Sequence, residues 1–214
     1  MPTHADQVRN HWWWRPGWRQ GRSFYTWHLT FDDQPDVTRV AEHYHAVLRD
    51  LPGVDPVPVP WLHLTMQGLG FADELTTDQV DKAAASVRDR LSTVPSFGLT
   101  LGPVRVDPEA LLLDADPADS VRDLRLAIRA GIADAWGAEH VPEQESPFTP
   151  HLSVGYINAD GPAAPLIAAL DANPATARAT VSEAQLILLN RDSGMYTWQP
   201  YAAASLLVAE RRSG

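Results

Sequence analysis

Two short segments of this sequence are spelled almost alike: residues 63–66 read His-Leu-Thr-Met, and residues 151–154 read His-Leu-Ser-Val. In a β-strand, the side chains at positions i and i+2 point to the same face. Each segment therefore predicts a strand that presents an imidazole and a hydroxyl on one face and buries apolar side chains on the other. If the fold joins these strands, they form a cleft with two imidazoles facing each other and two hydroxyls between them.

The composition limits the chemistry that the cleft can use. The chain of 214 residues is 44% hydrophobic and 21% charged, which suits one domain or two small lobes sharing a core. It has no cysteine, so disulfides, thiolate nucleophiles and cysteine–zinc sites are excluded. The N-terminal region lacks a signal-peptide core, and no apolar run is long enough to span a membrane. We expect a protein of the reducing cytoplasm with no membrane partner.

The charge balance bears on the substrate. The net charge is −10, with 17 Lys and Arg against 27 Asp and Glu. Proteins that bind long nucleic acids neutralise many phosphates with basic side chains. The sequence therefore predicts a small nucleotide or an RNA terminus as substrate and no extended duplex, and it leaves the oligomeric state open.

Residues 1–22 are predicted to form an N-terminal arm ahead of one bilobal domain, residues 23–210. The arm contains four closely spaced tryptophans together with arginines. One interpretation is a stacking surface for bases, with the arginines directed at phosphate. Another is that the rings fold back over an apolar face of the domain, and a third is docking with a partner protein.

Hydrophobic periodicity and turn residues predict alternating strands and helices after the arm. The predicted helices are residues 36–51, 77–91, 120–136 and 165–172, with Ser120 as an N-cap and Gly137 as a C-terminal stop. The predicted strands are residues 23–31, 61–68, 97–106, 110–115, 148–156, 184–190 and 201–209, and the proline-rich residues 55–60 are predicted to be a loop. This order indicates an α+β fold with mainly antiparallel sheet and no glycine-rich phosphate loop.

The surroundings of both motifs resemble the two-histidine (2H) phosphoesterase superfamily, in its branch of 2′-5′ RNA ligases and cyclic phosphodiesterases. The resemblance rests on residues 60–70 (PWLHLTMQGLG) and 147–154 (PFTPHLSV), and it runs from about Ser23 to a closing segment that contains Tyr196. A third His-x-Thr match, residues 28–31, lacks such surroundings. The resemblance implies two pseudo-symmetric lobes of mainly antiparallel β-sheet, with outer helices, around a central cleft lined by both motif strands.

Opening a cyclic phosphate requires a proton taken from water and a proton given to the leaving oxygen, and histidine does both near neutral pH. The resemblance implies that His63 is the catalytic acid and His151 the catalytic base. It also implies that Thr65 and Ser153 bind the non-bridging phosphate oxygens, with no metal and no cofactor. The predicted function is a metal-independent phosphodiesterase that opens 2′,3′-cyclic phosphates of nucleotides or RNA ends to 2′-phosphomonoesters.

His28 and Tyr156 are further candidates for substrate binding. His28 lies on the first predicted strand, where it either reaches the cleft or is an ordinary strand histidine. Ligase-type relatives carry an arginine shortly after the second histidine, but Val154-Gly155-Tyr156 occupy that stretch here. Tyr156 either stacks on a base or packs in the core. His4, His11 and His140 belong to no pattern.

Three alternatives stay open. The first is a 2′-5′ RNA ligase or 2′-5′ phosphodiesterase, and the absent arginine argues against its ligase form. The second is a non-catalytic module that binds nucleotides or RNA ends. The third is a metal hydrolase, for which the sequence has no HExxH motif or tight His/Asp cluster.

Overall fold

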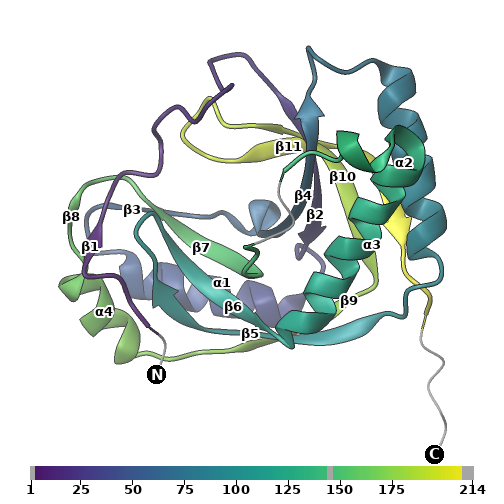
Figure 1. Cartoon of the computed structure of the whole chain (residues 1–214). Coiled ribbons are helices and arrows are strands. Elements are labelled where there is room, and N and C mark those ends of the chain that lie inside the picture. The colour runs from purple at the N-terminus through teal and green to yellow at the C-terminus, as the bar shows by residue number, and fades with distance from the viewer. Residues whose placement is uncertain (1–2, 144–146, 209–214) are drawn as a thin grey trace, which may run out of the picture.

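The computed structural model describes residues 3–143 and 147–208, and this part of the chain contains two main antiparallel sheets (Figure 1). The first sheet has the order β11 (Thr197–Ser205), β10 (Glu183–Asn190), β2 (Phe24–Thr30) and β4 (His63–Phe71). The second has the order β3 (Val54–Pro56), β7 (His151–Ile157), β6 (Ala110–Asp116), β5 (Phe97–Val106) and β9 (Ala177–Val181). Each sheet contains one motif strand, in agreement with the predicted pair of lobes around a central cleft.

Four α-helices cover the sheets in the described residues: α1 (Pro35–Leu48), α2 (Thr77–Leu91), α3 (Ala118–Trp136) and α4 (Ala164–Asp171). The amphipathic stripe of α2 is buried, and a capping box between Thr76 and Gln79 fixes its N-terminus. Helices α2 and α3 pack against each other beside the first sheet. They come close at Gly131, where a Cβ atom would lie 2.7 Å from the Cα of Val87.

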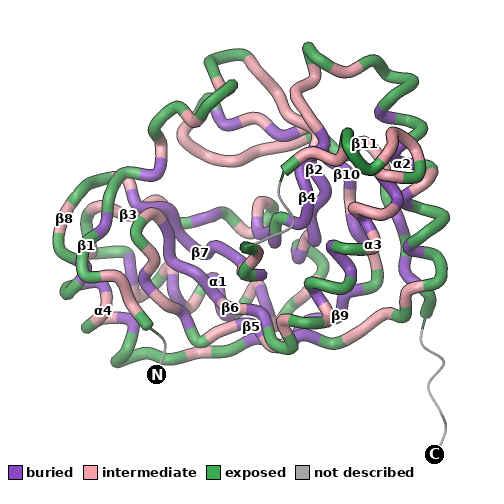
Figure 2. The backbone as a smooth tube through the Cα atoms, in the orientation of Figure 1, coloured by how far each residue is buried: buried purple, intermediate pink, exposed green. Residues whose placement is uncertain are grey.

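The chain passes repeatedly between the two sheets. Helix α1 follows β2 of the first sheet but packs on β9 and β3 of the second. Helix α3 follows β6 of the second sheet and packs mainly on α2, with contacts to β4 of the first sheet as well as to β6. The buried segments in Figure 2 follow the strands of both sheets and the inner faces of the helices. The two predicted lobes are therefore interwoven around one continuous apolar core.

Several element boundaries differ from the predictions. Helix α3 begins at Ala118 after Pro117, so Ser120 lies inside the helix and does not cap it. The predicted loop 55–60 contains the end of β3 and a 3₁₀ turn, Val59–Trp61. Strand β9 was not predicted, because its buried residues are small and alternate with only Arg178 and Thr180. Strand β7 begins at His151, after Pro150, and β11 begins at Thr197 and ends at Ser205.

The N-terminal arm runs along the second sheet and then crosses toward the first (Figure 1). Its strand β1 (Gln7–Val8) pairs with β8 (Gly161–Pro162), and the backbone N–H of His11 donates to the carbonyl of Ile157 at 2.7 Å. Trp12 and Trp18 fold back onto aromatic side chains, whereas Trp13 and Trp14 are 46% and 50% exposed. The division into residues 1–22 and 23–210 stays a prediction, and residues 1–2 and 209–210 lie outside the described part.

None of the helices in residues 3–143 and 147–208 combines the length and the apolar character needed to cross a membrane.

Candidate active site

The two motif strands meet where the two sheets adjoin. Strand β4 is an edge of the first sheet, and β3 pairs only with residues 155–157 of β7. The chain segment with His151 and Ser153 therefore extends past β3, and β4 contacts β7 across the boundary between the sheets. Antiparallel pairing to β2 and β6 holds both motif strands in register from their other sides.

His63, Thr65, His151 and Ser153 line one cavity of about 340 Å³. The i, i+2 spacing in each strand directs the imidazole and the hydroxyl to this same side, while Leu64 and Leu152 are fully buried behind them. The cavity thus brings together the four side chains that the sequence singled out. Their catalytic and binding roles stay predictions at this point.

The two imidazoles are held by matching hydrogen bonds. Nδ1 of His63 lies 2.8 Å from the carbonyl oxygen of Trp61, and Nδ1 of His151 lies 2.8 Å from that of Thr149. A carbonyl oxygen only accepts, so Nδ1 carries the proton in both neutral rings. Nε2 of each ring is then an unprotonated nitrogen that can accept a proton from water or from another donor.

Burial keeps both histidines neutral at pH 7. It lowers the pKa of His63 from 6.5 to about 4, against the opposing effect of the Trp61 carbonyl, and the neighbouring His151 lowers it further. Burial also lowers the pKa of His151, and the charge of Arg105 acts in the same direction. An anionic substrate would oppose these shifts, because negative charge beside an imidazole stabilises its protonated form.

His28 lies on the wall of the same cavity. It is the cross-strand neighbour of Thr65, and its ring stacks on His63 with 4.4 Å between centroids and 5° between planes. Its Nε2 lies 3.4 Å from Oγ1 of Thr65, and its buried Nδ1 has no hydrogen-bond partner among the described residues. In its Nε2–H tautomer, His28 would donate to Thr65 and leave the threonine hydroxyl hydrogen available for a substrate oxygen. Burial and the charge of His63 hold the pKa of His28 well below 6.5.

Tyr156 also borders the cavity, but it is packed in an aromatic cluster and only 3% exposed. Its ring centroid lies 4.4 Å from His11, 5.2 Å from Trp12 and 5.4 Å from Tyr196. Burial raises the pKa of its hydroxyl. Of the two interpretations of Tyr156, the structure favours packing in the core, because most of the ring surface is covered by neighbouring aromatic side chains.

Three arm residues, His11, Arg15 and Trp18, line the cavity. One interpretation of the sequence assigned the arm's tryptophans and arginines to bases and phosphate, but no pattern singled out His11. His11 is 7% exposed, and its Nε2 lies 3.0 Å from the hydroxyl of Tyr196. Burial, with the charge of Arg15, lowers its pKa to about 4. The density of aromatic and basic residues in the arm was the available signal, but it did not indicate which of them reach the cleft.

A second cavity of about 510 Å³ adjoins the first. It shares His151, Thr65 and Ser153 with the first cavity and adds Arg105 and Phe148. Arg105 is engaged by Asp114 at 2.9 Å and Asp107 at 2.5 Å. The two cavities thus adjoin at the histidine and hydroxyl groups of the motif strands.

The described residues include no group of three or more His, Cys, Asp or Glu side chains placed to hold a metal ion.

Comparisons with known proteins agree with this architecture. Among solved structures, TT0787 of Thermus thermophilus is similar over 86% of this chain and 97% of its own, with 20% identity and a TM-score of 0.64. E. coli LigT complexed with 3′-AMP is similar over 86% and 98%, with 18% identity and a TM-score of 0.63. The MHV ns2 PDE domain covers 79% of this chain and 99% of its own, with 10% identity and a TM-score of 0.55. At these identities the likeness shows the fold alone.

No curated protein matches the sequence. A family model described as the 2′-5′ RNA ligase superfamily matches residues 36–193, which include both histidine motifs and most of the two sheets. The matched region begins after the arm, so His11, Arg15 and His28 lie outside it. The chain therefore belongs to the 2′-5′ RNA ligase superfamily, the two-histidine phosphoesterases that its motifs resemble.

Proposed function

We propose that this protein is a metal-independent phosphodiesterase that opens 2′,3′-cyclic phosphates of nucleotides or RNA ends. The observation that carries the proposal is the matched pair of imidazoles, His63 and His151, with Nδ1 of each tied to a backbone carbonyl in one cavity. This arrangement leaves two Nε2 atoms for proton transfer around a single phosphorus atom. Solved structures of E. coli LigT complexed with 3′-AMP and with ATP support nucleotides as the substrate class.

The reaction follows from the two roles. Nε2 of His151 takes a proton from water, the water oxygen bonds to phosphorus, and the bond to one ribose oxygen breaks. Nε2 of His63, protonated under the influence of the bound phosphate, gives its proton to that leaving oxygen. The net change is addition of one water, and solvent then restores both protonation states. Thr65 and Ser153 donate to the non-bridging oxygens, where negative charge grows in the transition state.

A 2′-5′ phosphodiesterase is the second candidate function. The two adjoining cavities favour it, because together they provide room for a group on each side of the phosphorus. The same acid–base chemistry would then cleave a bond between two nucleosides. The reverse, bond-forming direction is the ligase reaction, and a module that binds nucleotides without turnover is the remaining alternative.

The absence of cysteine supports a reducing, cytoplasmic location.

The test is a panel of 2′,3′-cyclic nucleotides and 2′-5′-linked dinucleotides, assayed with and without EDTA. The native protein is compared with His63→Ala, His151→Ala and His140→Ala, the last being a matched exposed histidine outside the cleft. We expect loss of about 10²–10⁴ in rate for the first two variants and none for the third. Full activity of either cleft variant would overturn the acid–base roles, sensitivity to EDTA would indicate a metal enzyme, and binding without turnover a non-catalytic module.

A further inference from the structure

We propose that Arg15, carried into the cleft by the N-terminal arm, binds an anionic phosphate group of the substrate, and that Glu109 positions it. This inference rests on the proposed function and adds to the site a segment that lies outside the matched family region. Arg15 lines both adjoining cavities and so borders the point where they meet at His151 and Ser153.

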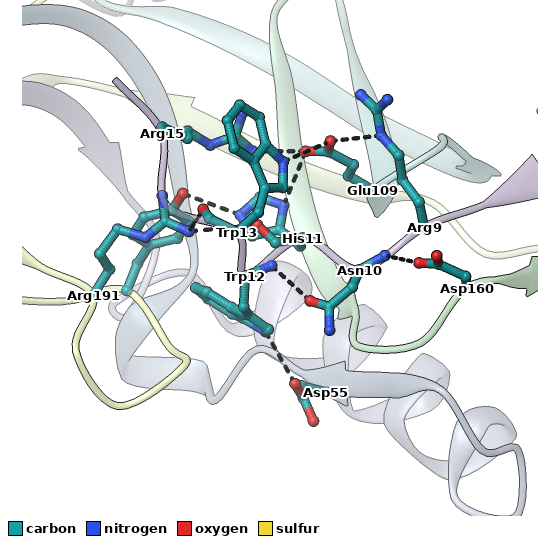
Figure 3. Close-up of polar contacts among 11 residues, drawn as sticks. Arg9, Asn10, His11, Trp12, Trp13, Arg15, Asp55, Glu109, Asp160 and Arg191 are labelled. Atoms are coloured by element: carbon teal, nitrogen blue, oxygen red, sulfur yellow. Dashed lines mark hydrogen bonds and ion pairs between the residues drawn. The ribbon is translucent and has the colours of Figure 1, made fainter. Parts of the chain in front are cut away.

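Glu109 fixes the guanidinium of Arg15 (Figure 3). Its carboxylate accepts hydrogen bonds from Arg15 at 2.7 Å, from Nε of Arg9 at 2.8 Å and from Nε1 of Trp13 at 3.1 Å. The Arg15 guanidinium also lies over the Trp13 ring, 4.9 Å from its centroid. A side chain held in this way loses little conformational freedom when it binds a ligand.

The charge and the donors of Arg15 remain available. Glu109 is shared by two guanidinium groups, so the three charged side chains retain a net positive charge. The Arg15 side chain is 34% exposed, against 12% for Glu109. Beyond its bond to Glu109, the other N–H donors of Arg15 have no partner among the described residues. Guanidinium donors of this kind match the oxygens of a phosphate.

The other arginines in and near the cleft are either paired with carboxylates or buried. Arg105 is neutralised by two carboxylates, Asp107 and Asp114. Arg125 is 6% exposed and donates to the carbonyl of Met66. Arg191, which lies under the arm, donates to the carbonyls of Trp13 and His11 (Figure 3).

The histidines of the cleft add no positive charge at pH 7. Burial lowers the pKa of each below 6.5, and all four are neutral: His11, His28, His63 and His151. Arg15 is thus the cation of the described cleft that is both partly exposed and incompletely paired. A phosphate that binds it would also provide the negative charge that protonates one of the two catalytic imidazoles.

The experiment measures binding separately from turnover. Calorimetry with inorganic phosphate and with a nucleoside 2′-monophosphate compares the native protein with Arg15→Gln and Arg19→Gln. Arg19 is the matched control, because it belongs to the same arm, is 69% exposed and pairs with Asp73 away from both cavities. We expect Arg15→Gln to weaken binding about tenfold to a hundredfold, the range for a charged hydrogen bond, and Arg19→Gln to leave it unchanged. Circular dichroism and Tm verify that both variants are folded.

Kinetics separates this inference from the proposed function. With a cyclic nucleotide, Arg15→Gln should raise KM by a similar factor and change kcat much less, and Glu109→Gln should have a smaller effect in the same direction. Unchanged KM and Kd in Arg15→Gln would overturn the role of Arg15 and leave the phosphodiesterase proposal standing. Phosphate binding that depends on Arg15, without any turnover, would support the role of Arg15 and overturn the phosphodiesterase proposal. A native protein that neither binds the probes nor turns over a cyclic nucleotide would overturn both.

Discussion

The imidazole ring of His28 stacks in parallel on that of His63, with 4.4 Å between the two ring centroids. Both rings are buried, and each is adjacent to a group of the candidate mechanism: His28 to Thr65, and His63 to the cavity shared with His151. Two positive charges at this separation in a desolvated site repel strongly. The stacked pair therefore carries no more than one positive charge at a time, and His63 becomes protonated to the imidazolium only while His28 is neutral.

Replacing His28 tests its role in positioning Thr65. His28→Phe keeps a flat ring against His63 but removes the N–H donor, so kcat should fall about threefold to tenfold, the value of one hydrogen bond. In the double variant with Thr65→Val, His28→Phe should cause no further loss, because it acts through the threonine. Steady-state kinetics of the four proteins measures this coupling. Additive losses would mean that His28 acts independently of Thr65.

The hydroxyls of Thr65 and Ser153 should contribute more to kcat than an ordinary hydrogen bond contributes to stability, because they stabilise charge that grows in the transition state. Thr65→Val and Ser153→Ala should each lower kcat by about 10²–10³, as loss of an oxyanion donor does in other enzymes. Thr65→Ser is the matched control, because it keeps the hydroxyl and should keep most of the activity. Rapid turnover by Thr65→Val would remove the threonine from the mechanism.

The pH dependence of kcat/KM should have its maximum below pH 6.5. The reaction needs one protonated and one neutral imidazole, and in the free enzyme the pKa of His63 is about 4 and that of His151 is also below 6.5. Rising pH removes the proton of the acid, so the profile should fall above pH 6.5. The profile of kcat should lie at higher pH, because the bound phosphate raises the pKa of the pair. An optimum of kcat/KM near pH 8 would contradict these assignments.

Acid should destabilise the protein between pH 6.5 and pH 4. The pKa values of His11 and His63 are about 4 in the folded chain and 6.5 in the unfolded one, so the unfolded chain binds more protons in this window. Each residue then costs roughly 3 kcal/mol of stability as the pH falls through the window. Urea unfolding at several pH values measures the loss. His63→Gln should reduce it, His140→Gln should not, and a flat stability between pH 6.5 and 4 would contradict the buried, neutral state.

The sequence was sufficient to predict the two motif strands, because the pattern that identifies them involves only neighbouring residues. The i, i+2 spacing of His63 and Thr65 determines one face of a strand, and hydrophobic periodicity determines helix α2. The match between the motifs then indicated that the two strands face one cleft. Nothing beyond neighbouring residues and one family resemblance was needed for these parts.

The rest of the site depends on contacts between distant segments. His11 reaches the cleft because its backbone pairs with Ile157, and Arg15 because Glu109, next to the turn between β5 and β6, holds it. His28 could be placed beside His63 only once the pairing of β2 with β4 was known. Strand β9 could not be predicted either, because its small residues adopt a strand conformation through pairing with the distant strand β5.

The exchange of helices between the two sheets has a consequence for how the molecule comes apart. Because α1 covers the sheet that does not contain β2, and the first sheet combines β2 and β4 with β10 and β11 from the far side of residue 95, a chain cut near that residue would leave two fragments with uncovered apolar faces. Fragments ending near residue 95 should be insoluble alone and should regain structure only when expressed together. The two sheets that form the cleft are thus parts of a single cooperative unit. We expect His63 and His151 to come together only when the whole fold is complete.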